Sequence, residues 1–334
     1  MINVTHYLRK FSPGAYSLER LFADIRAYMP ADIKIRSRES SFASRGLWRR
    51  IYNMLEAIFR QGEVNHITGD VHFLAILLFR RRTVLTILDC VLFQSLSGIH
   101  RSLLWLFWYA LPVRRAQVIT VVSEATKVEL LKFVNCDPPK IVVIYASVSE
   151  FFRPANHLFN STCPRVLQIG TTLHNKNIER VAEALATINC RWVIIGRLAA
   201  VQLAAIERFG IDFENYIDIS EDALLVQYKL ADMLVFASTY EGFGLPIVEA
   251  NAVGRPVVTS NLCSMPEVAG AAACLVDPYN VASIRAGILR VIQDTGYRNL
   301  LVHAGFENVK RFRPATIAAQ YAELYRRVHS AKQS

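Results

Sequence analysis

Residues 236–250 read FASTYEGFGLPIVEA, and this stretch decides the fold class of the 334-residue chain. An apolar run ends at Phe236 as a predicted strand. A helix is predicted from Leu245, with Pro246 in its first turn, where proline is tolerated. A strand that leads through a glycine-containing loop into a helix is the building unit of a parallel α/β sheet.

The same loop carries groups that suit a phosphorylated, hydroxyl-rich ligand. Gly242 and Gly244 allow a backbone to approach a ligand closely. The amides at the start of the helix lack partners within it and attract diphosphate oxygens. Glu241 lies in the loop and Glu249 follows eight residues later. These two carboxylates can accept hydrogen bonds from hydroxyls at opposite ends of an elongated polyol.

Short apolar runs alternate with amphipathic segments along the whole chain, which predicts parallel sheets. We expect strands at Ile2–Tyr7, Glu63–Ile67, Arg82–Leu88, Gln117–Val122, Pro164–Ile169, Arg191–Ile195, Met233–Phe236 and Pro256–Ser260. We expect helices at Ser17–Tyr28, Leu47–Arg60, Ser123–Phe133, Asn177–Thr187, Asp222–Leu230, Leu245–Val253, Val281–Gln293 and Ala315–Val328. The length predicts two domains, and the proline-containing segment 149–164 is the expected boundary.

The charge of the chain is uneven. Residues 1–115 hold 17 Lys+Arg against 8 Asp+Glu, whereas residues 116–334 hold 21 against 20. The partner of the basic first third could be a nucleic acid, an anionic membrane or an acidic substrate. Because no nucleic-acid recognition motif is present, we expect no nucleic-acid partner.

EGFGLPIVEA (241–250) resembles the E-x7-E motif of the retaining glycosyltransferases of the GT-B fold, a family that includes mannosyl- and glucosyltransferases of bacterial polysaccharide assembly. LQIGTTLHNKNIERVAEAL (167–185) and GRPVVTSNLCSMPEVAGAAACLVDP (254–278) are similar to neighbouring family segments. The resemblance implies two Rossmann-like domains with parallel sheets facing a central cleft. It implies an acceptor-binding domain over residues 1–153, to which the helix at 312–334 returns, and a nucleotide-sugar domain over 154–311.

The resemblance also implies roles for individual residues. Glu249 would hold the nucleotide ribose, and Glu241 would hold the sugar with the backbone of the glycine loop. Lys176 would stabilise the negative charge that develops on the leaving diphosphate. The expected donor-binding set is Gly14, Gly170, Thr171, Thr172, Lys176, Asn177, Arg197, Glu241, Gly242, Phe243, Gly244, Leu245 and Glu249.

The chain departs from the family pattern at two positions. Many relatives have an arginine where this sequence has Thr171 or Thr172, so Arg197 is a candidate for the missing cation. Many also have His-Asp where this chain has Leu88-Asp89. The segment NHITGDVH (65–72) follows another predicted strand and offers His66, Asp70 and His72 instead.

The mechanism implied by the resemblance is transfer with retention of anomeric configuration. No nucleophile is assured, so we favour front-face departure in which a donor phosphate oxygen takes the proton of the acceptor. The candidate catalytic residues are Lys176, Glu241, Asp89, Asp70 and His72. Because neither a DxD motif nor zinc-ligand spacing is present, we expect catalysis without a metal or cofactor.

A basic amphipathic helix is predicted over residues 45–60, RGLWRRIYNMLEAIFR. It could lie on anionic lipid or pack into the core with a solvated basic face. No apolar run is long enough to span a bilayer, and the N-terminal residues lack the pattern of a signal peptide. We therefore expect a cytoplasmic protein at the inner face of the plasma membrane, with a polyprenyl-diphosphate-linked or saccharide acceptor.

Two other functions remain open at this point. A non-catalytic nucleotide-sugar-binding scaffold subunit is favoured by Leu88, which stands where many relatives have the sugar-facing histidine. A sugar-nucleotide epimerase would share the fold, although EGFGLPIVEA favours a transferase. The leading hypothesis is a hexosyltransferase that uses GDP-mannose or a UDP-hexose in O-antigen or capsule synthesis.

Overall fold

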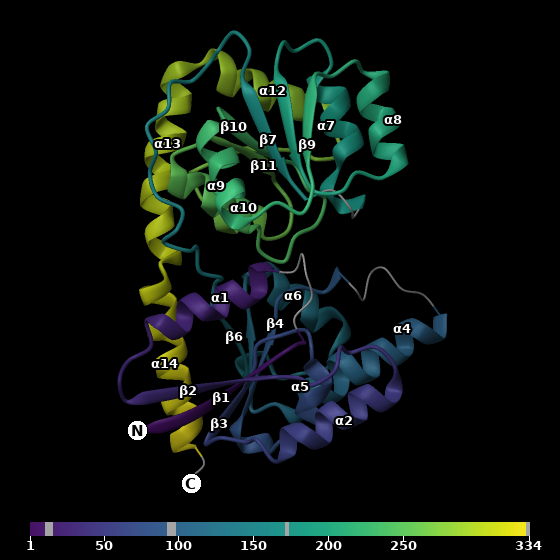
Figure 1. Ribbon diagram of the computed structural model, residues 1–334, viewed down its shortest axis with the longest axis vertical. Coiled ribbons are helices and arrows are strands. Elements are labelled where there is room, and N and C mark those ends of the chain that lie inside the picture. Colours follow the sequence, from purple (N-terminus) through teal and green to yellow (C-terminus); the bar gives the residue numbers. More distant parts are fainter. Residues whose placement is uncertain (11–15, 92–97, 171–173, 332–334) are drawn as a thin grey trace. The chain divides into compact units, whose positions relative to one another are not determined.

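The computed structural model describes residues 1–10, 16–91, 98–170 and 174–331 (Figure 1). The chain divides into two compact units, one made of Met1–Ser149 with Pro314–Ser334 and the other of Glu150–Arg313. Each unit contains one six-stranded sheet in which the paired strands run parallel. The predicted α/β class with two parallel sheets is therefore confirmed.

The sheet of unit 1 has the strand order β2-β1-β3-β4-β5-β6. Its strands are β1 (Ile2–Leu8), β2 (Ile33–Glu39), β3 (Val64–Ile67), β4 (Thr83–Ile87), β5 (Val118–Val121) and β6 (Ile141–Val143). Its α-helices are α1 (Tyr16–Ala27), α2 (Leu47–Ile58), α4 (Gly98–Leu104), α5 (Leu111–Arg115), α6 (Glu124–Phe133) and α14 (Pro314–Ser330). Shorter turns are η1 (His72–Ile76), η2 (Arg80–Arg82), the π-helix η3 (Trp105–Ala110) and η4 (Pro138–Lys140).

Alternation along the strands of unit 1 gives the sheet two different faces. Leu85 and Ile87 of β4 point into an apolar core that includes Ala57 of α2 and Leu130 of α6. The residue between them, Thr86, points the other way, where it is part of a hydrogen-bonded group reaching α14. Helices α1 and α14 cover this second face.

The sheet of unit 2 has the strand order β12-β11-β10-β7-β8-β9. Its strands are β7 (Arg165–Ile169), β8 (Arg191–Ile195), β9 (Phe213–Tyr216), β10 (Met233–Phe236), β11 (Val257–Ser260) and β12 (Cys274–Val276). Its helices are α7 (Ile178–Leu185), α8 (Ala200–Arg208), α9 (Glu221–Leu230), α10 (Leu245–Val253), α11 (Met265–Ala269), α12 (Val281–Gln293) and α13 (Thr295–Val309), with the 3-10 turns η5 (His174–Lys176) and η6 (Lys310–Phe312).

The same alternation builds the core of unit 2. Met233 and Val235 of β10 point into a cluster formed with α7 and α12, which cover one face of the sheet. Phe236, whose side chain points to the opposite face, lies against the start of α10. Helices α10 and α13 pack against each other (Figure 1). Both faces of the sheet are covered, as expected for parallel strands that read as continuous apolar runs.

Helix α2 buries only a few of its side chains. Its buried residues are Asn53 and Ala57, and Met54 packs against the unit 1 core. Leu47 and Leu55, which the sequence pattern places on one apolar stripe, are 67% and 49% exposed. Helix α2 therefore packs against the unit 1 core through Asn53, Met54 and Ala57, and it leaves Leu47 and Leu55 exposed.

Two buried histidines lie between the sheet of unit 1 and α14. The hydroxyl of Tyr325 lies 2.6 Å from Nδ1 of His66 and 2.9 Å from Nε2 of His6. The other nitrogen of His66 lies 2.7 Å from the hydroxyl of Thr86. Burial lowers the pKa of His66 to about 3. Burial, with a smaller contribution from His66, also lowers the pKa of His6 well below its usual range.

Acid should therefore destabilise unit 1. Both histidines titrate near pH 6.5 in the unfolded chain, which binds more protons than the folded chain once the pH falls below that value. The free energy of unfolding should drop by about 1.4 kcal/mol per pH unit for each of them below about pH 6.5. Urea unfolding followed by tryptophan fluorescence at pH 7.5, 6.0 and 5.0 measures this slope. His66→Gln should reduce the slope, whereas the exposed control His303→Gln should leave it unchanged.

Candidate functional site

The predicted site residues of unit 2 meet at one edge of its sheet. Gly170 follows β7, Glu241 follows β10, and Ser264 follows β11, and these three strands are neighbours in the order β11-β10-β7. In a parallel sheet the carboxyl ends of all strands lie at the same edge, where ligands of α/β proteins bind. Sequence positions that are almost a hundred residues apart are thus brought together within one unit.

Lys176 and Glu241 form an ion pair at this edge. Lys176 Nζ lies 2.6 Å from Glu241 Oε1, and only 18% and 14% of the two side chains are exposed. The ammonium also lies 5.1 Å from the centre of the Phe236 ring. A lysine ammonium has three N–H donors, and Glu241 takes one of them. The pair fixes a positive charge beside the glycine loop and leaves it able to donate to a phosphate oxygen.

Gly170 makes room for the lysine. Its φ is +84°, in the left-handed region, and a Cβ placed there would lie 2.9 Å from Cε of Lys176. Any other residue at position 170 would therefore be strained and would also push the lysine stem aside. This glycine is needed both for the turn after β7 and for the course of Lys176.

The short turn that carries Lys176 is held by amide side chains on both sides. Asn175 donates through Nδ2 to the carbonyl oxygen of Tyr240 at 2.7 Å, and Gln168 donates to that of Lys176 at 2.8 Å. Asn177 is buried and donates to the carbonyl oxygens of Ala237 and Pro278 at 2.9 and 2.7 Å. Because both of its side-chain N–H groups are used in this way, Asn177 holds the loop in position.

The glycine loop ends in a left-handed residue and is tied to the next strand. Gly244 has a φ of +102° and is the N-cap of α10. The buried hydroxyl of Ser264 lies 3.0 Å from the carbonyl oxygen of Glu241 and 2.8 Å from that of Phe243. The Phe243 ring packs edge-on against Phe312, with ring centres 5.5 Å apart. The Ser264 hydroxyl and the Phe312 ring thus hold the glycine loop in place.

Glu249 lies one turn along α10 and has a buried partner. The Tyr228 hydroxyl donates to Glu249 Oε2 at 2.5 Å. Burial, together with the negative charge of Glu249, raises the pKa of Tyr228 well above its usual range. The phenol therefore stays protonated and fixes one carboxylate oxygen of Glu249.

The remaining donor-site predictions have varied outcomes. Arg197 follows β8, is exposed, and lies 3.4 Å from Asp218 through Nη2. Leu245 is half-buried at the first position of α10. Gly14, Thr171 and Thr172 lie outside the residues that the structure describes.

In unit 1, the predicted polar residues gather after β3 and β4, which are adjacent strands. Trp108 links two of them, because its indole donates to Asp70 Oδ1 at 2.9 Å while its carbonyl oxygen lies 3.0 Å from His72 Nδ1. Burial lowers the pKa of His72, and the nearby carboxylates of Asp70 and Asp89 oppose part of this shift. Asp89 Oδ1 accepts from the Val91 amide at 3.0 Å.

His66 does not join this group. It is fully buried on the α14 face of the sheet, and both ring nitrogens lie within hydrogen-bond distance of hydroxyls. The expectation that His66 faces a ligand is therefore wrong. The strand period explains the difference, because a residue in the middle of β3 points into a covered face, whereas Asp70 lies beyond the strand end.

Several supporting residues were missed by sequence reasoning. Tyr228 lies outside the segments that resemble the family, and Trp108 lies in an aromatic-rich stretch with no polar pattern. Ser264 lies within the segment 254–278, but no role was predicted for it. Their roles depend on contacts between distant segments.

Two general properties of the described part of the chain bear on the chemistry. No cluster of three or more His, Cys, Asp or Glu side chains suited to a metal ion occurs among residues 1–10, 16–91, 98–170 and 174–331. Within those same ranges, no helix has the length and apolar character needed to cross a bilayer.

Comparison with known proteins gives one family model and several related sequences. Residues 150–307 match the family model of the glycosyl transferases group 1. O-antigen chain mannosyltransferase B of Escherichia coli is 30% identical over 238 residues, which are 63% of this chain and 61% of that protein. O-antigen chain mannosyltransferase RfbU of Salmonella typhimurium is 26% identical over 249 residues, which are 70% of this chain and 68% of that protein. The chain thus spans less than two thirds of the E. coli protein's length.

Solved structures resemble the whole chain. Sucrose-phosphate synthase from Thermosynechococcus elongatus superposes with a TM-score of 0.80 at 19% identity, covering 99% of this chain and 100% of that one. Anabaena HepE, solved in complex with UDP and glucose, gives a TM-score of 0.77 at 18% identity, covering 98% and 100%. At these identities the likeness concerns the fold.

Proposed function

We propose that the protein is a retaining hexosyltransferase of the GT-B fold, because residues 150–307 match the family model of the glycosyl transferases group 1 and solved structures resemble the whole chain. It would move a hexose from a nucleotide-diphosphate sugar to a lipid-linked or saccharide acceptor in O-antigen or capsule synthesis. The observation that carries the proposal is the Lys176–Glu241 pair beside the glycine loop of α10, at the carboxyl edge of the unit 2 sheet.

The proposed chemistry follows from the charges at this edge. The bond between the anomeric carbon and the donor phosphate oxygen breaks, and negative charge grows on the diphosphate. Lys176, held in place by Glu241, stabilises that charge, and so does the positive end of α10. The acceptor hydroxyl oxygen bonds to the anomeric carbon on the face that the phosphate leaves, and its proton passes to the departing phosphate oxygen. No metal ion or cofactor is required in this scheme.

The donor is proposed from the relatives and from the position of Glu249. Relatives named as O-antigen mannosyltransferases favour GDP-mannose, whereas HepE was solved with UDP and glucose. Glu249, with one oxygen fixed by Tyr228, is suited to accept the ribose hydroxyls common to both. We assign the acceptor to unit 1, where Asp70, His72 and Asp89 gather.

The test begins with thermal shift of the purified protein against GDP-mannose, GDP, UDP-glucose and UDP. The stabilising donor is then supplied with a polyprenyl-diphosphate-linked saccharide, and the product linkage is assigned by NMR. We expect transfer, with the anomeric configuration of the donor kept, in the presence of EDTA. Binding without transfer would favour the scaffold function, and conversion of the free nucleotide sugar would favour an epimerase. An inverted linkage would contradict the proposed mechanism.

We also propose that unit 1 meets the cytoplasmic face of the plasma membrane. The basic excess of residues 1–115 and the exposed side chains of α2 support this. Arg45 and Arg49 are exposed near the start of α2. Arg50 is not equivalent, because it donates to the Ser44 carbonyl oxygen and lies 4.7 Å over the Trp108 ring.

Arg45→Glu/Arg49→Glu should release the protein from anionic vesicles and leave donor binding intact. Each basic residue near an anionic surface contributes about 1 kcal/mol, and the attraction weakens as salt shortens the Debye length. Co-sedimentation with vesicles at 0.1 and 0.5 M NaCl measures the effect. Sedimentation that is the same for the variant and the wild type, or that does not change with salt, would contradict an electrostatic contact.

A further inference from the structure

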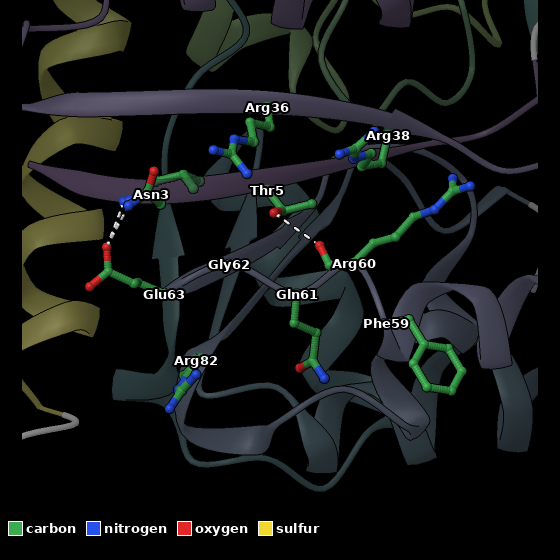
Figure 2. A pocket seen from close by; sticks show the side chains of 11 residues that line it. Asn3, Thr5, Arg36, Arg38, Phe59, Arg60, Gln61, Gly62, Glu63 and Arg82 are labelled. Carbon is green, nitrogen blue, oxygen red and sulfur yellow. Dashed lines mark hydrogen bonds between the residues drawn. The ribbon is translucent and has the colours of Figure 1, made fainter.

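Unit 1 has a second basic feature, a pocket of about 380 Å³ beside the end of α2 (Figure 2). It lies away from the carboxyl ends of β3 and β4, where Asp70 and Asp89 gather. Four of the residues that line it are arginines, namely Arg36, Arg38, Arg60 and Arg82. Among the described residues that line the pocket, Glu63 is the one with an acidic side chain. The lining therefore carries a clear excess of positive charge.

The pairing of the strands puts two of the arginines side by side. Arg36 pairs with Thr5 and Arg38 with Tyr7, so both point to the face of the sheet that α2 covers. Strand β2 is at the edge of the sheet, and both arginines are exposed. The hydroxyl of Thr5 donates to the carbonyl oxygen of Arg60 at 3.2 Å, which fixes the segment after α2 across the floor of the pocket.

The acidic groups nearby do not neutralise this charge. Arg60 pairs with Glu56 at 2.9 Å. Glu63 accepts from the amide and the side chain of Asn3 at 2.9 and 3.1 Å, at one end of the pocket (Figure 2). Arg36, Arg38 and Arg82 have no ion-pair partner among the residues that the structure describes. Guanidinium groups gathered in this way match the oxygens of a phosphate group.

An apolar row leads directly to the pocket. Trp48, Tyr52, Leu55 and Phe59 follow one another at helical spacing along α2 and its end, and they are 81%, 52%, 49% and 88% exposed. Phe59 itself lines the pocket, and its ring points away from the arginines (Figure 2). Large apolar side chains bordering a basic pocket are the arrangement of a surface that lies in a lipid headgroup layer. A soluble phosphate would make no use of this row.

We propose that the arginine pocket binds the phosphate of an anionic phospholipid headgroup, while Trp48, Tyr52 and Phe59 enter the interface beside it. This inference rests on the proposed membrane contact and deepens it, because it assigns a particular site in place of a general charge attraction. Arg36 and Arg38 hold the phosphate, and the apolar row of α2 supplies the lipid contact.

The test compares two charge-matched variants of the full chain. Arg36→Gln/Arg38→Gln removes two of the four arginine charges of the pocket, and Arg208→Gln/Arg327→Gln removes two exposed arginines elsewhere. Co-sedimentation uses phosphatidylcholine vesicles with and without 20% phosphatidylglycerol. The pocket variant should bind the anionic vesicles about thirty-fold more weakly than the wild type, from roughly fivefold per basic residue. The control should stay within about twofold, and Phe59→Ser should weaken binding without changing its dependence on salt.

The outcomes distinguish the membrane contact of unit 1 from the specific phosphate site in the arginine pocket. Failure of the wild type to bind anionic vesicles overturns both the membrane contact and the pocket. Binding of the wild type with equal losses in the pocket and control variants overturns the pocket alone. A third outcome is that sn-glycerol 3-phosphate raises the melting temperature of the wild type and not of the pocket variant, while the pocket variant binds vesicles as well as the wild type does. This outcome assigns the pocket to a soluble phosphate and overturns the lipid site. Unchanged melting temperatures show that the variants are folded.

Discussion

Lys176→Met should lower the rate of sugar transfer about 100- to 1,000-fold, the range found when one preorganised donor is removed from a site of developing charge. The effect is expected on turnover more than on donor affinity, because the charge that Lys176 stabilises is largest after the glycosidic bond has begun to break. Its ammonium is held 2.6 Å from Glu241, so its position changes little during the reaction.

The control for this variant is Lys310→Met, which also removes the lysine of a Lys–Glu pair, formed on the surface with Glu307. That pair is exposed, and its loss should change neither rate nor stability measurably. Lys176→Met leaves Glu241 without its partner, so the double variant Lys176→Met/Glu241→Gln separates loss of charge from loss of folding. A single variant that keeps at least a third of the wild-type turnover would remove Lys176 from the mechanism.

Glu249→Gln should weaken binding of the nucleotide-sugar donor by about 10- to 100-fold, since hydrogen bonds to a charged acceptor contribute about 1.5–3 kcal/mol. Glutamine is chosen because its carbonyl oxygen can still accept from the Tyr228 hydroxyl, which alanine would leave buried without a partner. Isothermal titration with the donor and with the bare nucleotide gives the affinity. Both ligands should be affected alike if the carboxylate holds the ribose.

Two further variants show whether the loss of donor affinity is caused by removal of the Glu249 carboxylate. Tyr228→Phe keeps the carboxylate and removes only the group that positions it, so donor affinity should fall by no more than about fivefold. Glu183→Gln, on the exposed side of α7, changes the net charge of unit 2 by the same amount and should have no effect. If Glu249→Gln binds the donor as tightly as Glu183→Gln does, the ribose assignment is wrong.

The central strands of both sheets were predictable because a strand that is buried on both faces has a continuous apolar sequence. The strands expected at Met233–Phe236 and Arg191–Ile195 have these bounds in the structure, and the other expected strands differ by one residue at one end or at both ends. Strands β2, β6, β9 and β12 were not predicted, and all four are at sheet edges. Strands β2 and β9 read IKIRSRE and FENY, because one side of an edge strand is open to water and polar residues are tolerated there. Strands β6 and β12 are each only three residues long.

The candidate site was predictable in composition and less so in geometry. The motif with the glycine loop identified Glu241 and Glu249 through their spacing, and the family resemblance added Lys176. That Lys176 and Glu241 contact each other follows from the adjacency of β7 and β10, which local sequence does not encode. The exposure of Leu47 and Leu55 on α2 could not be predicted for a similar reason, since periodicity predicts an apolar stripe without telling which partner covers it.

Helix α14 has a consequence for the order in which a growing chain can fold. Unit 2 is continuous in sequence, whereas the His6–His66 face of unit 1 is covered by Tyr325, which is synthesised only after all of unit 2. On the ribosome, unit 2 can reach its native state before α14 is synthesised. Until then, one face of the sheet formed by the first 149 residues stays uncovered. Chaperones that shield exposed apolar surface should therefore bind nascent chains through unit 1, and should be released when α14 emerges from the exit tunnel.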